Sequence, residues 1–190
     1  MPTHPNRFRL RNDARNYGLI AITLHWVVAL AVIGMFALGV WMTGLGYYDP
    51  WYRQGPALHK SVGVLILLLM LLRLARRLLD PPPPAEPGAS ALEQRLALLA
   101  HQAMYLLLFA IAISGYLIST ADGRGIAVFG LFEIPALFSG FDRQEDIAGA
   151  VHWYLALGLI GLAALHALAA LKHHFIDRDR TLKRMLGIRD

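Results

Sequence analysis

The sequence predicts an all-α protein, a four-helix bundle that crosses a membrane with both termini in the cytoplasm. Of its 190 residues, 56% are hydrophobic and only 16% are charged, whereas a soluble domain carries about 25% charged residues. Four apolar stretches each provide the roughly 20 helical residues that a bilayer core requires. The length suits one membrane domain, residues 17–171, between an N-terminal arm of residues 1–16 and a basic tail of residues 172–190. The expected spans cover about residues 17–41, 57–79, 96–120 and 147–171.

The basic residues predict the orientation, because the cytoplasmic segments of membrane proteins are enriched in lysine and arginine. Of the eighteen basic residues, fourteen lie in the N-terminal arm, in or beside the second connection, or in the tail. Both termini are therefore expected in the cytoplasm. The same bias accounts for the net charge of +5 without a nucleic-acid partner. The four basic residues on the opposite, outer side are Arg53, Lys60, Arg124 and Arg143.

The segments around the spans have distinct characters. The first apolar run is too long for the core of a cleaved signal peptide, and no small-residue cleavage site follows it. The second connection contains Pro81–Pro84, a stiff stretch that cannot continue a helix and spaces the second span from the third. The outer connection, residues 121–146, mixes glycines, aromatic residues and acids. We expect it to form a short lid helix over the outer face.

Four histidines lie inside the spans, where an ionisable side chain is costly and indicates a functional role. His25 is about eight residues into the first span, near the cytoplasm, and His59 lies at the outer end of the second. In the fourth span His152 is near the outer start, and His166 follows fourteen residues later, about 21 Å along the same helix face. Matching depths pair His59 with His152 on the outer side and His25 with His166 on the inner side.

Two imidazoles from different helices at one depth are what a six-coordinate haem iron needs as axial ligands. Two such pairs predict two haem b groups stacked across the bilayer. The chain has no cysteine, which excludes covalent haem attachment, iron–sulfur clusters and thiol nucleophiles. Small residues lie about one turn from each histidine, as close approach to a helix requires. They are Ala21, Ala29, Gly55, Gly63, Ala148, Ala156, Ala163, Ala169 and Ala170.

Other interpretations of these histidines stay open. Each could be a polar core residue that forms hydrogen bonds across helices. A zinc site would need three or four ligands converging on one point. The interiors of the spans contain no aspartate or glutamate, which weakens the zinc interpretation and also argues against a proton-relay transporter.

Four further side chains are candidates for the same chemistry. His101, at the cytoplasmic start of the third span, is a candidate contact of the inner haem or a quinone, with interfacial packing as the alternative. His173 lies seven residues after His166, within reach of a quinone carbonyl or a haem propionate. Arg73 is expected either to pair with an inner propionate or to extend to the lipid headgroups. Lys60, beside His59, is a candidate to neutralise an outer propionate or to attract an anionic substrate.

Taken in order, several short motifs resemble the bacterial cytochrome b561 family over essentially the whole chain. They are Ile22-Thr23-Leu24-His25-Trp26, Leu58-His59-Lys60, Leu71-Leu72-Arg73-Leu74, Val151-His152-Trp153, Leu165-His166 and Lys172-His173-His174-Phe175. The resemblance implies a multi-pass diheme protein of the bacterial inner membrane, with the same four histidines as ligands in the same pairs. It also implies a ubiquinone site near the inner haem that includes the position of His173. The activity it implies is electron transfer from periplasmic superoxide to ubiquinone.

Three functions remain open from the sequence. A superoxide:ubiquinone oxidoreductase would need a positive funnel for its anionic donor, which Lys60, Arg53, Arg124 and Arg143 would form if they clustered over the outer haem. A quinol-linked cytochrome b subunit would instead exchange electrons with a periplasmic redox protein that docks on residues 121–146. A haem-free membrane scaffold or transporter would show no b-type spectrum.

Overall fold

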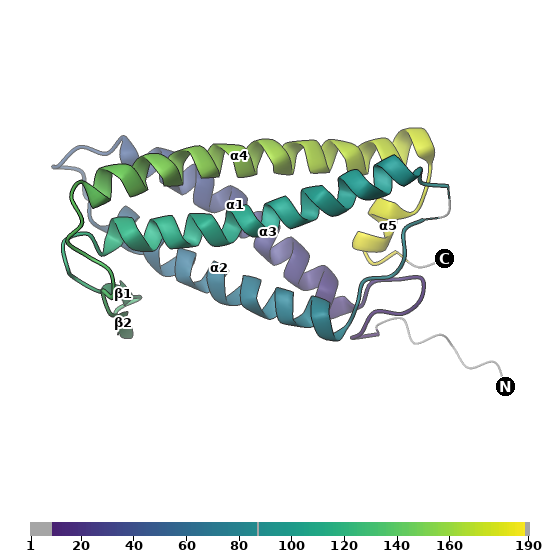
Figure 1. Ribbon diagram of the computed structural model, residues 1–190, viewed down its shortest axis with the longest axis horizontal. Coiled ribbons are helices and arrows are strands. Elements are labelled where there is room, and N and C mark those ends of the chain that lie inside the picture. Colours follow the sequence, from purple (N-terminus) through teal and green to yellow (C-terminus); the bar gives the residue numbers. More distant parts are fainter. Residues whose placement is uncertain (1–8, 87, 189–190) are drawn as a thin grey trace.

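The computed structural model describes residues 9–86 and 88–188, and its main feature is an up-and-down bundle of four long helices (Figure 1). They are α1 (Leu19–Thr43), α2 (Gln54–Leu79), α3 (Ala91–Ser119) and α4 (Gln144–Lys172). A hairpin of β1 (Ile126–Val128) and β2 (Phe132–Ile134) lies at one end of the bundle. A π-helical turn, η1 (His173–Asp177), and the short helix α5 (Thr181–Met185) lie at the other end.

Three helices are long and apolar enough to cross a membrane: α1, α3 and the continuous segment Gln144–Asp177 that joins α4 to η1. Within the most apolar window of α3, none of the residues is buried inside the protein. Helices that expose apolar side chains all round suit a lipid environment, so the chain is a membrane protein. α2 is of similar length but carries Lys60, Arg73, Arg76 and Arg77, and it is not one of these three. A fourth crossing and the cytoplasmic position of both ends therefore stay predictions.

The helix boundaries follow from local hydrogen bonding. α2 ends at Leu79, directly before the prolines, and Asp80 at its end forms an ion pair of 3.0 Å with Arg76. α3 begins at Ala91, five residues before the expected span, because Ser90 and Glu93 form a reciprocal capping box. The polar first turn of this helix extends beyond its apolar region, which explains why hydropathy places the start too late.

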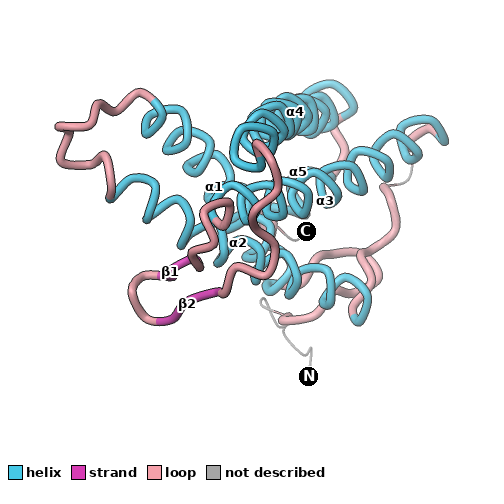
Figure 2. Tube along the Cα trace, turned by 60° about the vertical axis from the view of Figure 1, so that its left-hand side comes forward, coloured by secondary structure: helices cyan, strands magenta, loops and turns pink. Residues whose placement is uncertain are grey.

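The lid helix expected in the outer connection is wrong, because the segment forms an antiparallel hairpin with Val128 paired to Phe132. Phe129 and Gly130 at its tip have φ of 49° and 70°, backbone values that suit a tight hairpin turn and exclude a right-handed helix. The hairpin docks on α2 through Ser61, whose hydroxyl accepts a hydrogen bond from Phe129 N at 3.0 Å. Figure 2 shows the hairpin beside this end of α2.

The rest of the outer connection is also fixed to the helix ends. Tyr116 of α3 donates a hydrogen bond to Pro135 O at 2.8 Å and accepts one from Leu137 N at 2.6 Å. The buried amide of Gln144 donates to Leu117 O at 2.9 Å. These bonds hold the connection in one conformation over the end of the bundle where α3 finishes and α4 begins.

The basic tail is folded against the opposite end of the bundle. Arg184 of α5 is only 6% exposed; its guanidinium lies 2.9 Å from Glu86 and donates a hydrogen bond to Pro84 O at 3.0 Å. Trp26 of α1 donates its indole N–H to Met185 O at 2.8 Å. The proline-rich connection, α1 and α5 therefore form one packed layer at this end.

Candidate functional site

The rings of His59 and His152 face one another near the hairpin end of the bundle. His59 lies near the start of α2 and His152 near the start of α4. Their ring centroids are 6.2 Å apart and their planes are inclined by 67°. The two rings therefore meet edge to face, at a centroid distance near the upper end of the range for aromatic pairs.

α3 orients the imidazole of His152. Its Nδ1 lies 3.1 Å from the carbonyl oxygen of Ile111 and 3.1 Å from the hydroxyl of Ser114. Ser114 itself donates to Ile111 O at 3.0 Å. A carbonyl only accepts, so Nδ1 carries the proton and donates it to Ile111. Nε2 is then the unprotonated nitrogen, free to bind a metal, and the backbone contact fixes the ring as second-sphere partners of metal-bound histidines do.

Two glycines make room for these rings. A β-carbon at Gly39 of α1 would lie 3.3 Å from Cε1 of His59, and one at Gly115 of α3 would lie 3.2 Å from Cε1 of His152. Both distances are tighter than ordinary side-chain contacts. The Nδ1 atom of His59 is buried and has no hydrogen-bond partner among the described residues. A buried polar atom without a partner is an exception in folded proteins and calls for an explanation, such as a bound group beside the ring.

A second pair, His25 of α1 and His166 of α4, has nearly the same geometry. The ring centroids are 6.3 Å apart with planes inclined by 63°. His101 of α3 also lies at this level, with its ring centroid 5.2 Å from that of His166. Three imidazoles from three helices thus meet toward the α5 end of the bundle.

Arg73 points into this second cluster. Its guanidinium lies 3.0 Å from Nδ1 of His25 and 5.7 Å from the ring centroid of Tyr105. Arg76 instead binds Asp80 at the end of α2. The alternative in which Arg73 extends outward to the headgroups is therefore not the conformation observed.

The two facing pairs suit a metal held between axial imidazoles. Metal–imidazole nitrogen bonds of about 2 Å on either side of an ion separate the ring centroids by roughly 6 Å. The observed 6.2 and 6.3 Å agree with that spacing, whereas the 5.2 Å between His101 and His166 is too short. The donor set of neutral imidazoles from two helices, in an apolar bundle, fits a haem iron.

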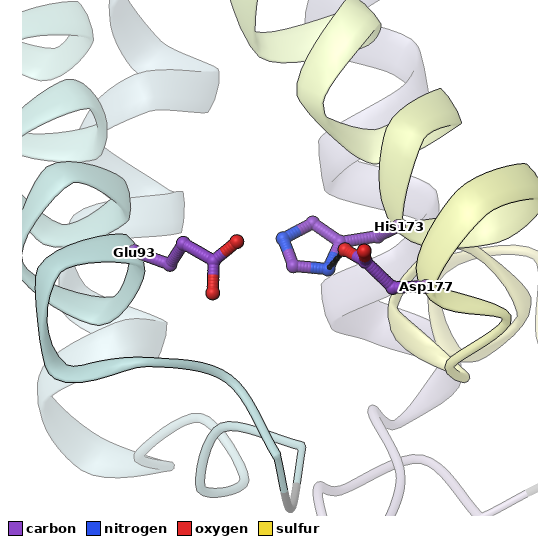
Figure 3. A group of neighbouring side chains, drawn as sticks. All are labelled: Glu93, His173 and Asp177. Atoms are coloured by element: carbon purple, nitrogen blue, oxygen red, sulfur yellow. Dashed lines mark ion pairs between the residues drawn. The ribbon is translucent and has the colours of Figure 1, made fainter.

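One further group of potential metal ligands lies at the end of α4 and comprises Glu93, His173 and Asp177 (Figure 3). The ammonium of Lys172 lies 2.6 Å from Glu93 and 2.8 Å from Asp177. A cation of the protein itself therefore neutralises these carboxylates. His173 is the one residue of this group that the sequence singled out.

The outer basic residues are placed differently from one another. Arg124 forms an ion pair with Asp122, and Arg143 lies 3.9 Å from Asp146. Lys60 is half-buried beside His59 and forms no ion pair within the part of the chain that the structure describes. Clustering of Arg53, Lys60, Arg124 and Arg143 stays a prediction.

A bundle of apolar helices with two facing histidine pairs and no cysteine defines a membrane protein suited to carry haem. The chain belongs to the prokaryotic cytochrome b561 family, whose model matches residues 16–187. It is 51% identical over 176 residues to cytochrome b561 homolog 2 of Escherichia coli (strain K12), covering 93% of this chain and 94% of that protein. It is 35% identical over 174 residues to the probable superoxide oxidase CybB of Yersinia pestis, covering 90% and 96%. A third relative, cytochrome b561 homolog 1 of E. coli (strain K12), is 26% identical over 172 residues, covering 87% and 93%.

Family membership makes the chain a membrane-bound haem b protein of electron transfer. The resemblance drawn from the sequence motifs is thereby confirmed. The four histidines remain predicted ligands, now with a measured geometry. Sequence reasoning missed Gly39, Gly115 and Ser114, because they support the histidines from neighbouring helices and not from one turn away on the same helix.

Proposed function

We propose that this cytochrome b561 carries electrons across the bacterial inner membrane through two haem b groups, from periplasmic superoxide to ubiquinone. His59 and His152 would hold the outer haem, and His25 and His166 would hold the inner haem. The observation that carries the proposal is the repetition of one spacing, 6.2 and 6.3 Å, at two levels of the same bundle. His152 and His166 are fourteen residues apart on α4, so the two levels are about 21 Å apart along the helix.

When bound, the haems supply a one-electron path between the two faces of the membrane. The protein orients the ligands and tunes the charge around them. At the outer level, Ile111 and Ser114 hold His152 with Nε2 available for iron. At the inner level, a ligating His25 would carry its proton on Nδ1 and could no longer accept a hydrogen bond from Arg73. Arg73 is then free for a charge-assisted bond to a haem propionate.

The donor is assigned to superoxide on two grounds. One relative of this chain is named a probable superoxide oxidase, and Lys60 lies next to a histidine of the outer pair without an ion-pair partner among the described residues. Two superoxide anions each lose one electron and leave as O2. One ubiquinone accepts both electrons with two protons and leaves as ubiquinol. Lys60 serves to attract the anion.

The acceptor side is assigned to the level of His25, His101 and His166. His173 lies beyond it on the same helix and enters η1, with a ring that is 19% exposed. With the α5 end of the bundle on the cytoplasmic side, the protons that quinone reduction consumes are available at this end. The ring centroid of His101 lies 5.2 Å from that of His166. We assign His101 as a side chain that packs between the inner histidine pair and the quinone.

The second candidate is a quinol-linked subunit that exchanges electrons with a periplasmic redox protein. It is favoured by the exposed apolar surface of the outer connection, where Leu131 is 82% and Leu137 is 73% exposed. The pairing of Arg124 with Asp122 also reduces the positive charge available to steer superoxide.

Rapid mixing of the oxidised holoprotein with superoxide separates these candidates. A superoxide oxidase shows haem reduction that salt slows, because steering of an anion by exposed charge is screened. Lys60→Gln should slow haem reduction by superoxide several-fold. Arg95 is a basic residue on the opposite side, and Arg95→Gln should leave the rate unchanged. Slow reduction that is insensitive to salt and to Lys60 would contradict superoxide as the donor and favour a protein partner.

A further inference from the structure

His173 is held between two carboxylates where α4 passes into η1. Its Nδ1 lies 2.6 Å from Oδ2 of Asp179 and 3.1 Å from Oδ2 of Asp177. The other oxygen of Asp179 accepts a hydrogen bond from Thr181 N at 2.8 Å. This last bond ties the carboxylate to the backbone at the start of α5. The ring of His173 is therefore fixed by a rigid partner and not only by its own helix.

The carboxylates belong to a chain of charges that reaches α3. Lys172 joins Asp177 to Glu93, with distances of 2.8 and 2.6 Å. The groups that face His173 are therefore Glu93 from α3, Lys172 from α4, Asp177 from η1 and Asp179 from the segment before α5. The side chains of His173 and Asp179 are 19% and 17% exposed, so this pair lies just below the protein surface.

The outer nitrogen of the ring is left for another partner. Among the described residues, none forms a hydrogen bond with Nε2 of His173, which points toward α3 and Glu93 in Figure 3. Burial acts to raise the pKa of Asp179, but hydrogen bonds from Thr181 and His173 outweigh it and hold the pKa below its ordinary value. The carboxylate is thus ionised near neutral pH and accepts the Nδ1–H of His173.

We propose that Asp179 is a positioning residue that orients His173 and makes the pair the entry point for the cytoplasmic protons consumed at the quinone. This rests on the proposed reduction of ubiquinone at the inner end of the bundle. Each of the two electrons that reach the quinone is matched by one proton. For each proton, the Nε2–H bond of the doubly protonated ring breaks and a quinone O–H bond forms. A proton from solvent water then rebinds Nε2, while Nδ1–H stays hydrogen-bonded to Asp179.

The pair has the arrangement that proton transfer by histidine requires. A carboxylate on Nδ1 fixes the tautomer and orientation of the ring, while Nε2 is left for the group that takes up the proton. π-Helical turns such as η1 recur at functional sites. The neighbouring ion pair of Lys172 with Glu93 and Asp177 holds the second carboxylate in place at its 3.1 Å distance.

Asp179→Asn tests the proposal in the haem-loaded protein. The asparagine keeps an oxygen for Thr181 N, so the start of α5 is preserved. The reduced protein is mixed with a short-chain ubiquinone, and haem oxidation is followed as a function of pH. We expect oxidation about 10- to 100-fold slower, the range typical for loss of a group that orients a reactive histidine. The dependence of the rate on pH should change as well, because the ionised carboxylate that contacts the ring is lost.

Three controls separate this role from a structural one. Asp80→Asn, at the same end of the bundle but bound to Arg76 and Asn12, should leave the rate unchanged. Oxidation by ferricyanide, which takes up no proton, should be equal in all variants. Asp179→Glu should restore part of the rate. As an independent readout, the histidine signals absent from nitrogen-15 spectra of His173→Gln should shift in Asp179→Asn, because the carboxylate that accepts the Nδ1–H of the ring is lost.

The outcomes are distinct. If the parent protein is not oxidised by ubiquinone at all, the proposed function fails, and this inference with it. If the parent is oxidised and Asp179→Asn shows the same rate, the same pH profile and the same histidine signals, the proposed function stands and the role of Asp179 is overturned.

Discussion

Gly39 and His59 lie so close across α1 and α2 that a β-carbon at position 39 would be 3.3 Å from Cε1 of His59. The glycine therefore sets the room available to one ring of the outer pair. A branched side chain at this position must displace the imidazole, since protein interiors leave little slack. Gly34, five residues earlier on the same helix, is different, because a β-carbon there would meet no atom within 4 Å.

Gly39→Val should accordingly lower the haem content from two toward one per chain, with the remaining haem at the inner level. Gly34→Val carries the same change in helix propensity without the clash and should keep both haems. Haem quantified per purified chain checks the pair. Equal haem content in the two variants would argue against a tight fit around His59.

Ser114 is the second supporting residue open to test. It is only 4% exposed, and its hydroxyl lies 3.1 Å from Nδ1 of His152. Ser114→Ala should weaken binding of the outer haem by about 10- to 100-fold, the usual effect of removing a second-sphere partner of a ligand. Titration of the apoprotein with haem measures this change in affinity. Ser119→Ala is the matched control and should bind haem normally, because among the described residues the Ser119 hydroxyl donates only to Gly115 O of the same helix.

Arg73 supplies a positive charge beside the inner pair. A cation near a haem favours the reduced state, so Arg73→Gln should lower the potential of the inner haem. A tenfold change in a one-electron equilibrium corresponds to about 59 mV, and a shift on the order of that size is expected. Redox titration of both haems provides the measurement. Arg76→Gln, which loses only the ion pair with Asp80, should leave both potentials in place; equal shifts in the two variants would count against a specific role of Arg73.

Arg184 is expected to fix α5 to the bundle. It is 6% exposed and paired with Glu86, whose side chain is 14% exposed. Removing one partner of such a buried ion pair lowers the free energy of unfolding by about 3–5 kcal/mol. Arg184→Ala should therefore release α5 and speed cleavage by trypsin after Arg180, while Lys183→Ala should not. Unchanged cleavage of the Arg184 variant would show that Trp26 and the proline-rich connection hold α5 without it.

The features that could be predicted from the sequence are those that depend on the position of a residue along its own helix. Depth along the chain was enough to match His59 with His152 and His25 with His166, and the structure brings the rings of each predicted pair to 6.2 and 6.3 Å. Their role as ligands stays a prediction. Pro81–Pro84 likewise marks the end of α2, because a proline lacks the donor that the next helical turn needs.

Features that depend on the register between helices could not be read from the sequence. Gly39 and Gly115 support histidines on other helices, and a lone helical glycine gives no sign of what it faces. Gly55, one of the small residues expected to make room beside His59, has another role. A β-carbon at this position would contact Met42 and Trp41, so Gly55 allows helix packing. The hairpin was missed because its turn depends on positive φ at Phe129, a value that phenylalanine seldom adopts.

Haem stoichiometry in single and double histidine variants tests the central claim most directly. The parent protein should bind two haems per chain, and His59→Ala should bind one. Adding His152→Ala to it should remove nothing further, because both residues hold the same haem, whereas adding His25→Ala should remove the second haem. One haem in the parent protein, or loss of both haems in the His59→Ala and His152→Ala double variant, would contradict the two pairs.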